Sequence, residues 1–142
     1  MLNADQRCVF ENVKAHLLHQ KCHEGKKCSC DFKPLRLFVS GVGGTGKSFL
    51  IEAIKALVHS IWSTDALVCA IAAPTGLAAF NVGGITIYRL FQLSIEHTAK
   101  TASYWSLPKS SQKVMHTSLL NVKLFIIDEI SMVSSLNLAY IH

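Results

Sequence analysis

The segment GVGGTGKS, residues 41–48, constrains the fold of this chain more than any other stretch. It fits the pattern G-x-x-x-x-G-K-[ST], in which backbone N–H groups surround a phosphate and the following helix adds partial positive charge. The apolar residues 35–40 precede it and predict a strand, and an apolar face at helical spacing follows from Lys47. A strand, a glycine-rich turn and a helix are the context that a phosphate-binding loop requires. The sequence therefore predicts such a loop at 41–48.

Each type of residue in this loop has an expected task. Lys47 is expected to reach the β- and γ-phosphates of a nucleotide, and the Ser48 hydroxyl is expected to bind Mg²⁺. A glycine-rich turn that binds nothing is the alternative, and the Lys-Ser pair and the predicted strand–helix context argue against it. The residues expected to contact the nucleotide here are Gly41, Gly43, Gly44, Thr45, Gly46, Lys47 and Ser48.

Two consecutive carboxylates, Asp128 and Glu129, end the apolar run in LFIIDEISMV, residues 124–133. Burying either charge without a partner is costly, so the pair predicts a cation or polar ligand at this strand end. Ligands of parallel α/β sheets bind at the carboxyl ends of the strands. We expect Asp128 to share Mg²⁺ with Ser48, directly or through water. Adjacent strand residues point to opposite sides, so Glu129 is expected to polarise an attacking water as a general base. A helix start that favours acids is the alternative.

The order of predicted elements indicates the fold class. Helical and strand-like segments alternate, and residues 66–74 are apolar without alternation, as in a parallel strand covered on both faces. The sequence therefore predicts an α/β fold with a parallel sheet flanked by helices. The other expected elements are a helix at 3–20, a basic Cys/His loop at 21–34, a short helix closed by Gly83 and Gly84, an ambiguous stretch at 85–93, a loop at 94–109, a helix from Ser110 to Leu120 and a strand at 122–128.

Composition narrows the class of protein. The 142 residues correspond to about one domain, and a net charge of +5 with a pI near 9.0 favours a polyanionic partner. We see no apolar run of membrane-spanning length and no secretory signal. The five cysteines, an odd number, are expected to be reduced thiols of an intracellular protein.

One cluster of potential metal ligands consists of His19, Cys22, His23, Cys28 and Cys30. Its spacing lacks the paired C-x2-C knuckles of familiar zinc sites, so a solvated basic insertion is the favoured interpretation. Cys8 and Cys69 fall on apolar faces and are expected to be packing residues.

Four segments resemble, in order, the first four motifs of the PIF-type (petite integration frequency) DNA helicases. They are LNADQ (2–6), GVGGTGKSFL (41–50), APTGLAAFNVGGITIYRLF (73–91) and LFIIDEISMV (124–133). These helicases are superfamily-one motors that move 5′ to 3′ on single strands. The helicase portion of certain mobile elements is a close relative, and the chain resembles it at least as well.

The resemblance implies a fold, two cofactors and a partner. Residues 1–142 would be an incomplete P-loop NTPase (RecA-like) domain, with Walker A at 41–48, motif Ia at 73–91 and Walker B at 124–129. ATP and Mg²⁺ would be the cofactors and single-stranded DNA the partner, in DNA repair, recombination or genome maintenance, within the nucleus or a mitochondrion. By the same comparison the chain lacks a γ-phosphate sensor, arginine fingers and the second motor domain, so we expect no translocation by the 142 residues alone.

The resemblance also assigns roles to individual residues outside the loop. Gln6 would read the adenine edge, although its spacing from Asn3 equally predicts a capping box. Thr75 and the N–H groups of Gly76 and Leu77 would bind a DNA phosphate, or else form a helix start that meets only water. Tyr88 stands where His is common, and either stacks on a base or packs in the core, where Phe91 is also expected.

Two further points stay open at the level of sequence. The segment YWSLPK, residues 104–109, places two aromatic residues among lysines, which suits single-stranded nucleic acid, but a loop anchored by its own aromatic residues is favoured. A small-molecule kinase and a non-catalytic ATP-binding module are the alternatives to a helicase. The kinase is disfavoured because we find no arginine-rich lid or acceptor pocket in the sequence.

Overall fold

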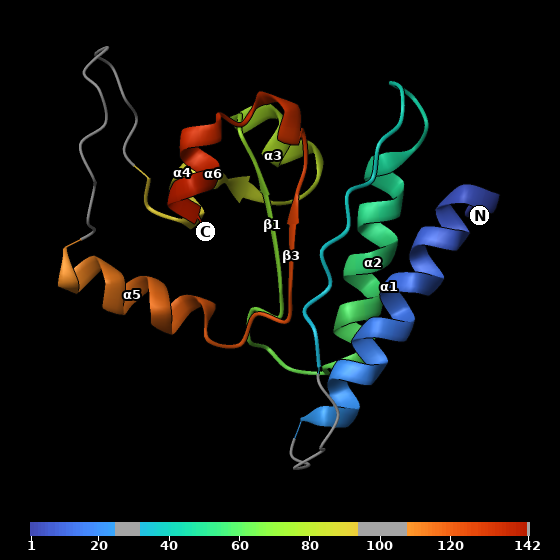
Figure 1. The fold of residues 1–142 in the computed structure, drawn as a ribbon, viewed down its shortest axis with the longest axis horizontal. Coiled ribbons are helices and arrows are strands. Elements are labelled where there is room, and N and C mark those ends of the chain that lie inside the picture. Colours follow the sequence, from blue (N-terminus) through green and yellow to red (C-terminus); the bar gives the residue numbers. More distant parts are fainter. Residues whose placement is uncertain (25–31, 94–107, 142) are drawn as a thin grey trace. The chain divides into compact units, whose positions relative to one another are not determined.

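The computed structural model describes residues 1–24, 32–93 and 108–141 (Figure 1). The chain divides into two compact units, residues 1–65 and residues 66–142. We describe each unit by itself.

The first unit is built on two helices, α1 (Ala4–His23) and α2 (Lys47–Ile61), which pack side by side (Figure 1). Apolar residues recur at helical spacing on both helices, and burying that stripe is what stabilises the pair. The side chains buried in this unit are Val13, Leu17, Leu50, Ile51, Ile54, Val58 and Trp62. The apolar face predicted to follow the glycine-rich loop is therefore confirmed.

Helix α1 begins with the predicted capping box. The Asn3 side chain accepts a hydrogen bond from the Gln6 N–H at 2.8 Å, and the Gln6 side chain accepts one from the Asn3 N–H at 3.0 Å. Two of the unpaired donors at the helix start are satisfied in this way. The helix predicted at 3–20 is confirmed and runs three residues further, to His23.

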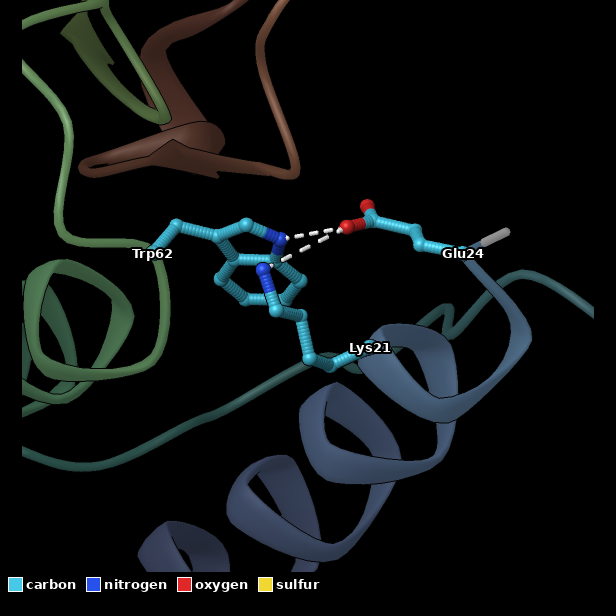
Figure 2. Close-up of polar contacts among 3 residues, drawn as sticks. All are labelled: Lys21, Glu24 and Trp62. Carbon is cyan, nitrogen blue, oxygen red and sulfur yellow. Dashed lines mark hydrogen bonds and ion pairs between the residues drawn. The ribbon is translucent and has the colours of Figure 1, made fainter. Parts of the chain in front are cut away.

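A polar contact joins the C-terminal ends of α1 and α2 (Figure 2). The indole N–H of Trp62 donates to Glu24 Oε2 at 2.7 Å, and Lys21 Nζ lies 3.8 Å from the same oxygen. The Lys21 ammonium also sits 5.4 Å from the centroid of the Trp62 ring. An indole that is 95% buried thus keeps a partner for its only polar atom, as buried Trp usually does.

The prediction of a strand at residues 35–40 is wrong, because this segment has no regular secondary structure. A strand exists only where a neighbouring strand pairs with it, and the described part of the first unit contains none. Strand pairing depends on residues distant in the sequence, so the apolar run alone does not decide it.

The second unit contains a three-stranded parallel sheet in the order β2-β1-β3. Its strands are β1 (Cys69–Ala73), β2 (Ile85–Thr86) and β3 (Leu124–Ile127). Ala72 pairs with Ile85 on one side and with Ile127 on the other, and every residue of β1 is buried. The predicted strands at 66–74 and 122–128 are confirmed in shorter form, and so is the α/β fold with a parallel sheet.

Helices of the second unit connect and follow these strands (Figure 1). They are α3 (Gly76–Asn81), α4 (Ile87–Leu90), α5 (Lys109–Leu119), a 3₁₀ turn at Ile130–Met132 and α6 (Ser135–Ile141). The ambiguous stretch 85–93 forms β2 and α4. The helix expected from Ser110 begins one residue earlier, with Pro108 at its N-cap, because the fixed φ of proline suits a helix start. The core here is centred on Ala70, Ala72, Ile87, Leu90 and Val133.

Gly83 and Gly84 close α3 as predicted. Gly83 adopts a φ of +59°, and the Gly84 N–H donates to the Ala79 carbonyl at 2.8 Å. A Cβ atom at Gly84 would collide with the carbonyl oxygen of Ile71 in β1. A side chain there would therefore push β2 away from β1.

Candidate functional site

The glycine-rich loop turns directly into α2. Gly46 is the N-cap residue at φ +78°, and Gly44 has φ +79°, a backbone conformation that favours glycine. The first intrahelical hydrogen bond runs from the Leu50 N–H to the Gly46 carbonyl, and no side chain in the described residues caps the helix. The N–H groups of the first turn therefore remain available at the positive end of the helix dipole, as phosphate binding requires.

Lys47 points back into the loop. Its Nζ donates to the carbonyl oxygens of Gly41 at 2.8 Å and Val42 at 3.1 Å. Thr45 Oγ1 donates to the same Val42 carbonyl at 2.9 Å, which ties the loop to itself. Ser48 is exposed in the first turn of α2. The Lys47 ammonium group and the exposed Ser48 residue thus lie at the helix start.

Gln6 connects α1 to this loop. Its Nε2 donates to the carbonyl of Thr45 at 2.9 Å and to that of Gly46 at 3.2 Å, while its Oε1 serves the capping box. A Cβ at Gly46 would come within 2.6 Å of this amide nitrogen. The capping interpretation is confirmed, and Gln6 also lies against the loop. Sequence reasoning missed this contact because it spans 39 to 40 residues and leaves no local spacing signal.

The acidic pair follows β3 as predicted, but its geometry is not that of an extended strand. The Asp128 N–H donates to the Ala72 carbonyl at 2.8 Å, and the Glu129 N–H donates to Asp128 Oδ1 at 3.0 Å. Glu129 adopts the left-handed conformation at φ +51°, ψ +41° and begins the 3₁₀ turn. The expectation that strand alternation separates the two carboxylates is wrong, because β3 ends at Ile127 and neither residue lies in the strand. Asp128 is half-buried and Glu129 is exposed.

Thr75, Gly76 and Leu77 begin α3, after β1 has ended. Thr75 Oγ1 accepts a hydrogen bond from the Ala78 N–H at 3.2 Å, so the predicted N-cap is confirmed, and Leu77 is 73% exposed. Because β1 and β3 are parallel and in register at Ala72 and Ile127, this helix start and the acidic pair follow the same edge of the sheet. That is the edge where α/β sheets bind ligands.

Tyr88 is half-buried and packs against the core of the second unit. Its hydroxyl accepts a hydrogen bond from Asn137 Nδ2 at 3.2 Å. The packing interpretation accounts for both contacts, and base stacking by Tyr88 stays a prediction. Phe91 also packs against this core, with its ring centroid 5.8 Å from that of Phe125.

The Cys/His cluster is only partly within the described residues. Cys28, Cys30 and the YWSL part of the aromatic segment, residues 104–107, lie outside them, and the described residues contain no group of three or more metal-ligating side chains. Cys69 is buried as expected, but the packing role predicted for Cys8 is wrong because Cys8 is exposed. Only Val13 and Leu17 of α1 are buried, and Cys8 lies outside that stripe.

The loop with Gln6 belongs to the first unit, and the acidic pair with the α3 start belongs to the second. The predicted joint binding of Mg²⁺ by Ser48 and Asp128 therefore stays a prediction. Across the residues that the structure covers, none of the helices has the length and apolar character needed to cross a membrane.

Comparison with known proteins agrees with the motifs. A family model described as "PIF1-like helicase" matches residues 1–139. The ATP-dependent DNA helicase RRM3 of Saccharomyces cerevisiae is 36% identical over 101 residues, which cover 71% of this chain and 13% of RRM3. Pif1 of Campylobacter jejuni is 35% identical over 102 residues, covering 70% of this chain and 22% of that helicase. PIF1 of S. cerevisiae is 30% identical over 99 residues, covering 70% and 11%.

Proposed function

The chain belongs to the PIF1-like helicase family, and from this premise we propose that it is the ATP-binding part of a 5′-to-3′ DNA helicase that hydrolyses Mg-ATP to move along single-stranded DNA. The observation that carries the proposal is the loop at 41–48, where Lys47 Nζ is held 2.8 Å from the Gly41 carbonyl beside the start of α2. The named relatives are ATP-dependent DNA helicases, and the chain covers 11–22% of the length of those three. The activity of a whole helicase is accordingly part of the proposal.

In this proposal the loop binds the phosphates. The N–H groups of the first turn of α2 and the Lys47 ammonium would contact the β- and γ-phosphates, and Lys47 would exchange its carbonyl partners for phosphate oxygens. Gln6 would exchange its partners Asn3, Thr45 and Gly46 for the adenine edge when a nucleotide binds. An amide that both donates and accepts suits adenine, which offers a donor and an acceptor on one edge.

Mg²⁺ fits the oxygen groups of this chain. The exposed Ser48 hydroxyl and the Asp128 carboxylate are hard oxygen donors of the kind that Mg²⁺ prefers. Asp128 uses Oδ1 to accept the Glu129 N–H, and that bond orients its carboxylate at the strand end. When bound, Mg²⁺ supplies positive charge that offsets the charge of the phosphates.

Glu129 is proposed as the general base. Its left-handed backbone follows the end of β3, and the residue is exposed. A carboxylate there would orient a water molecule and accept its proton. A non-glycine residue in this conformation costs about 1–3 kcal/mol, and such outliers concentrate at functional sites.

The start of α3 is the proposed contact with DNA. The N–H groups of Gly76 and Leu77, oriented by the Thr75 cap, would bind a backbone phosphate of the single strand. Such a contact carries no sequence information, which suits a motor that must move along any sequence. Tyr88 could stack on a base only by giving up part of its packing against the core.

The remaining parts of the proposal concern the whole protein. Residues 1–142 would form part of the first RecA-like domain, and translocation would need a second motor domain. Repair, recombination or genome maintenance in the nucleus or a mitochondrion is the proposed setting, supported by family membership and by five cysteines that suit a reducing compartment.

Nucleotide binding by the 142-residue chain tests the proposal. Lys47→Ala should weaken Mg-ATP binding by about tenfold or more, since a charge-assisted contact to phosphate contributes about 1.5–3 kcal/mol. Lys55→Ala, on the same helix α2 but away from the loop, is the matched control and should bind as the wild type does. Equal affinities for wild type and Lys47→Ala would refute a phosphate-binding role for the loop.

A second measurement separates the helicase from the kinase and the non-catalytic module. Single-stranded DNA should raise phosphate release by a longer protein that carries both motor domains, and a small acceptor molecule should not. Stimulation by the small acceptor alone would point to a kinase. Phosphate release that is the same in the wild type and in Glu129→Gln would point to a non-catalytic module.

A further inference from the structure

Two histidines on the last turns of α1 bring their nitrogens together away from the nucleotide loop. His19 and His23 are one helical turn apart, and their Nε2 atoms lie 3.0 Å from each other. The ring centroids are 4.5 Å apart and the rings are nearly perpendicular, at 89°. The proposed nucleotide chemistry makes no use of this pair.

The arrangement of the rings limits how directly the two nitrogens face each other. If both nitrogens pointed straight at each other, the centroids would be separated by the nitrogen–nitrogen distance plus the radius of both rings, which exceeds the observed 4.5 Å. The hydrogen bond between them is therefore bent, and at least one nitrogen points away from the line that joins the two. One of the two nitrogens carries the proton of this hydrogen bond, so an ion placed to one side of the line could take both lone pairs once that ring holds its proton on Nδ1 instead.

We propose that His19 and His23 form a two-histidine site for a divalent transition-metal ion, with Zn²⁺ as the ion that fits best. Nitrogens 3.0 Å apart, with metal–nitrogen bonds of about 2.0–2.1 Å, give a nitrogen–metal–nitrogen angle of about 95°. Opening the pair to about 3.3–3.4 Å gives the tetrahedral angle that Zn²⁺ prefers. Small side-chain rotations on the helix surface supply that change, and water can occupy the other coordination positions.

The surroundings favour a preformed site. Phe32 packs against the rings of His19 and His23, at centroid distances of 5.7 Å and 5.6 Å, and against His16 at 5.0 Å. Contact with Phe32 limits the rotation of both ligand rings. Ligands that are held in place before binding lose less entropy on binding, and groups around a metal site commonly tune its affinity. A bound ion would link one turn of α1 near its C-terminal end.

Zinc titration of the 142-residue chain, freed of any histidine tag and kept reduced, tests the proposal. Calorimetry should show one equivalent of Zn²⁺ bound by the wild type. His19→Gln and His23→Gln should each lower the affinity by about tenfold or more, in line with the loss of one of two protein ligands. His16→Gln, which also contacts Phe32, and Cys22→Ser, which lies between the pair in sequence, are the matched controls and should stay within about twofold of wild type.

Thermal unfolding gives an independent readout, because an ion that binds only the folded chain raises its midpoint. At the same zinc concentration, the midpoint of the wild type and of both controls should rise, and that of the two histidine variants should rise clearly less. Circular dichroism without metal checks that the variants keep α1. Wild-type affinity in either histidine variant, or an equal loss in a control, would overturn the assignment.

Discussion

At the start of α1, Gln6 uses both ends of its side-chain amide. Oε1 accepts the Asn3 N–H in the capping box, and Nε2 donates to the carbonyls of Thr45 and Gly46. The orientation of the amide is fixed by these partners, since only the nitrogen can donate to carbonyls. One residue therefore contributes to helix stability and to the geometry of the loop, and different substitutions should separate the two contributions.

Replacing Gln6 by Glu or by Ala should have different effects on stability but the same effect on nucleotide choice. Glu keeps an acceptor for the Asn3 N–H and adds negative charge at the helix start, whereas Ala loses the cap at a cost of about 1 kcal/mol. Neither can donate to the loop carbonyls or read adenine. We expect the ATP-to-GTP affinity ratio to fall towards one in both variants, measured with fluorescent analogues. Urea unfolding should show a loss in both from the missing hydrogen bonds to the loop, with an additional loss in Ala from the missing cap. A Glu variant with the wild-type ratio would contradict the adenine role.

Glu129 should lower the folding stability of the chain while it provides the carboxylate of the proposed general base. Its φ of +51° is unfavourable for a side chain but suits glycine, so Glu129→Gly should raise the free energy of unfolding by about 0.5–1 kcal/mol. Glu129→Gln keeps the backbone strain and should leave stability nearly unchanged. Urea unfolding of the two variants provides the measurement. If glycine destabilised the chain, the left-handed conformation would not be the one populated in solution.

Among the elements, α1 and α2 are joined by their apolar stripe and by the contact of Trp62 with Glu24 and Lys21 (Figure 2). Because Gln6 reaches the loop from the other end of α1, the packing of the helices also determines how Gln6 meets Thr45. The stability of the helix pair and the geometry of the loop should therefore be coupled.

Trp62→Phe should remove the hydrogen bond to Glu24 while keeping most of the buried ring. We expect a loss of about 1–2 kcal/mol, because the acceptor is charged and the cation–π contact with Lys21 weakens. Trp62→Ala should cost about 3–5 kcal/mol by leaving a cavity. Urea unfolding measures both, and a Phe variant as unstable as the Ala variant would show that the polar contact outweighs the packing.

The junction of β1 and β2 depends on a glycine. Gly84→Ala would place a methyl group against the Ile71 carbonyl, which belongs to the backbone and cannot move aside, so we expect a loss of about 1–3 kcal/mol. Gly76→Ala is the control, because nothing lies within 4 Å of a Cβ there and alanine favours the helix. The control should be neutral or slightly stabilising in the same unfolding assay. Equal losses in both would mean that β2 does not pack closely on β1.

Over the whole molecule, local signals predicted more than long-range ones. The capping box of α1, the glycine-rich turn into α2, the buried β1 and the helix closed by Gly83 each follow from a few neighbouring residues, and each is confirmed. The prediction of a strand at 35–40 failed because a strand needs a partner that is distant in the sequence. The two residues of β2 were too few to produce a recognisable sequence pattern. The contact of Gln6 with the loop and the convergence of His19 with His23 required side-chain geometry.

The central claim is that Ser48 and Asp128 hold one Mg²⁺ against the phosphates of ATP. A double-mutant cycle with Ser48→Ala and Asp128→Asn, read as the Mg²⁺-dependent gain in ATP affinity, tests it most directly. If both groups bind one ion, each single variant should lose most of that gain, and the double variant should lose little more than either. Losses that simply add, or a full gain in both single variants, would contradict the account.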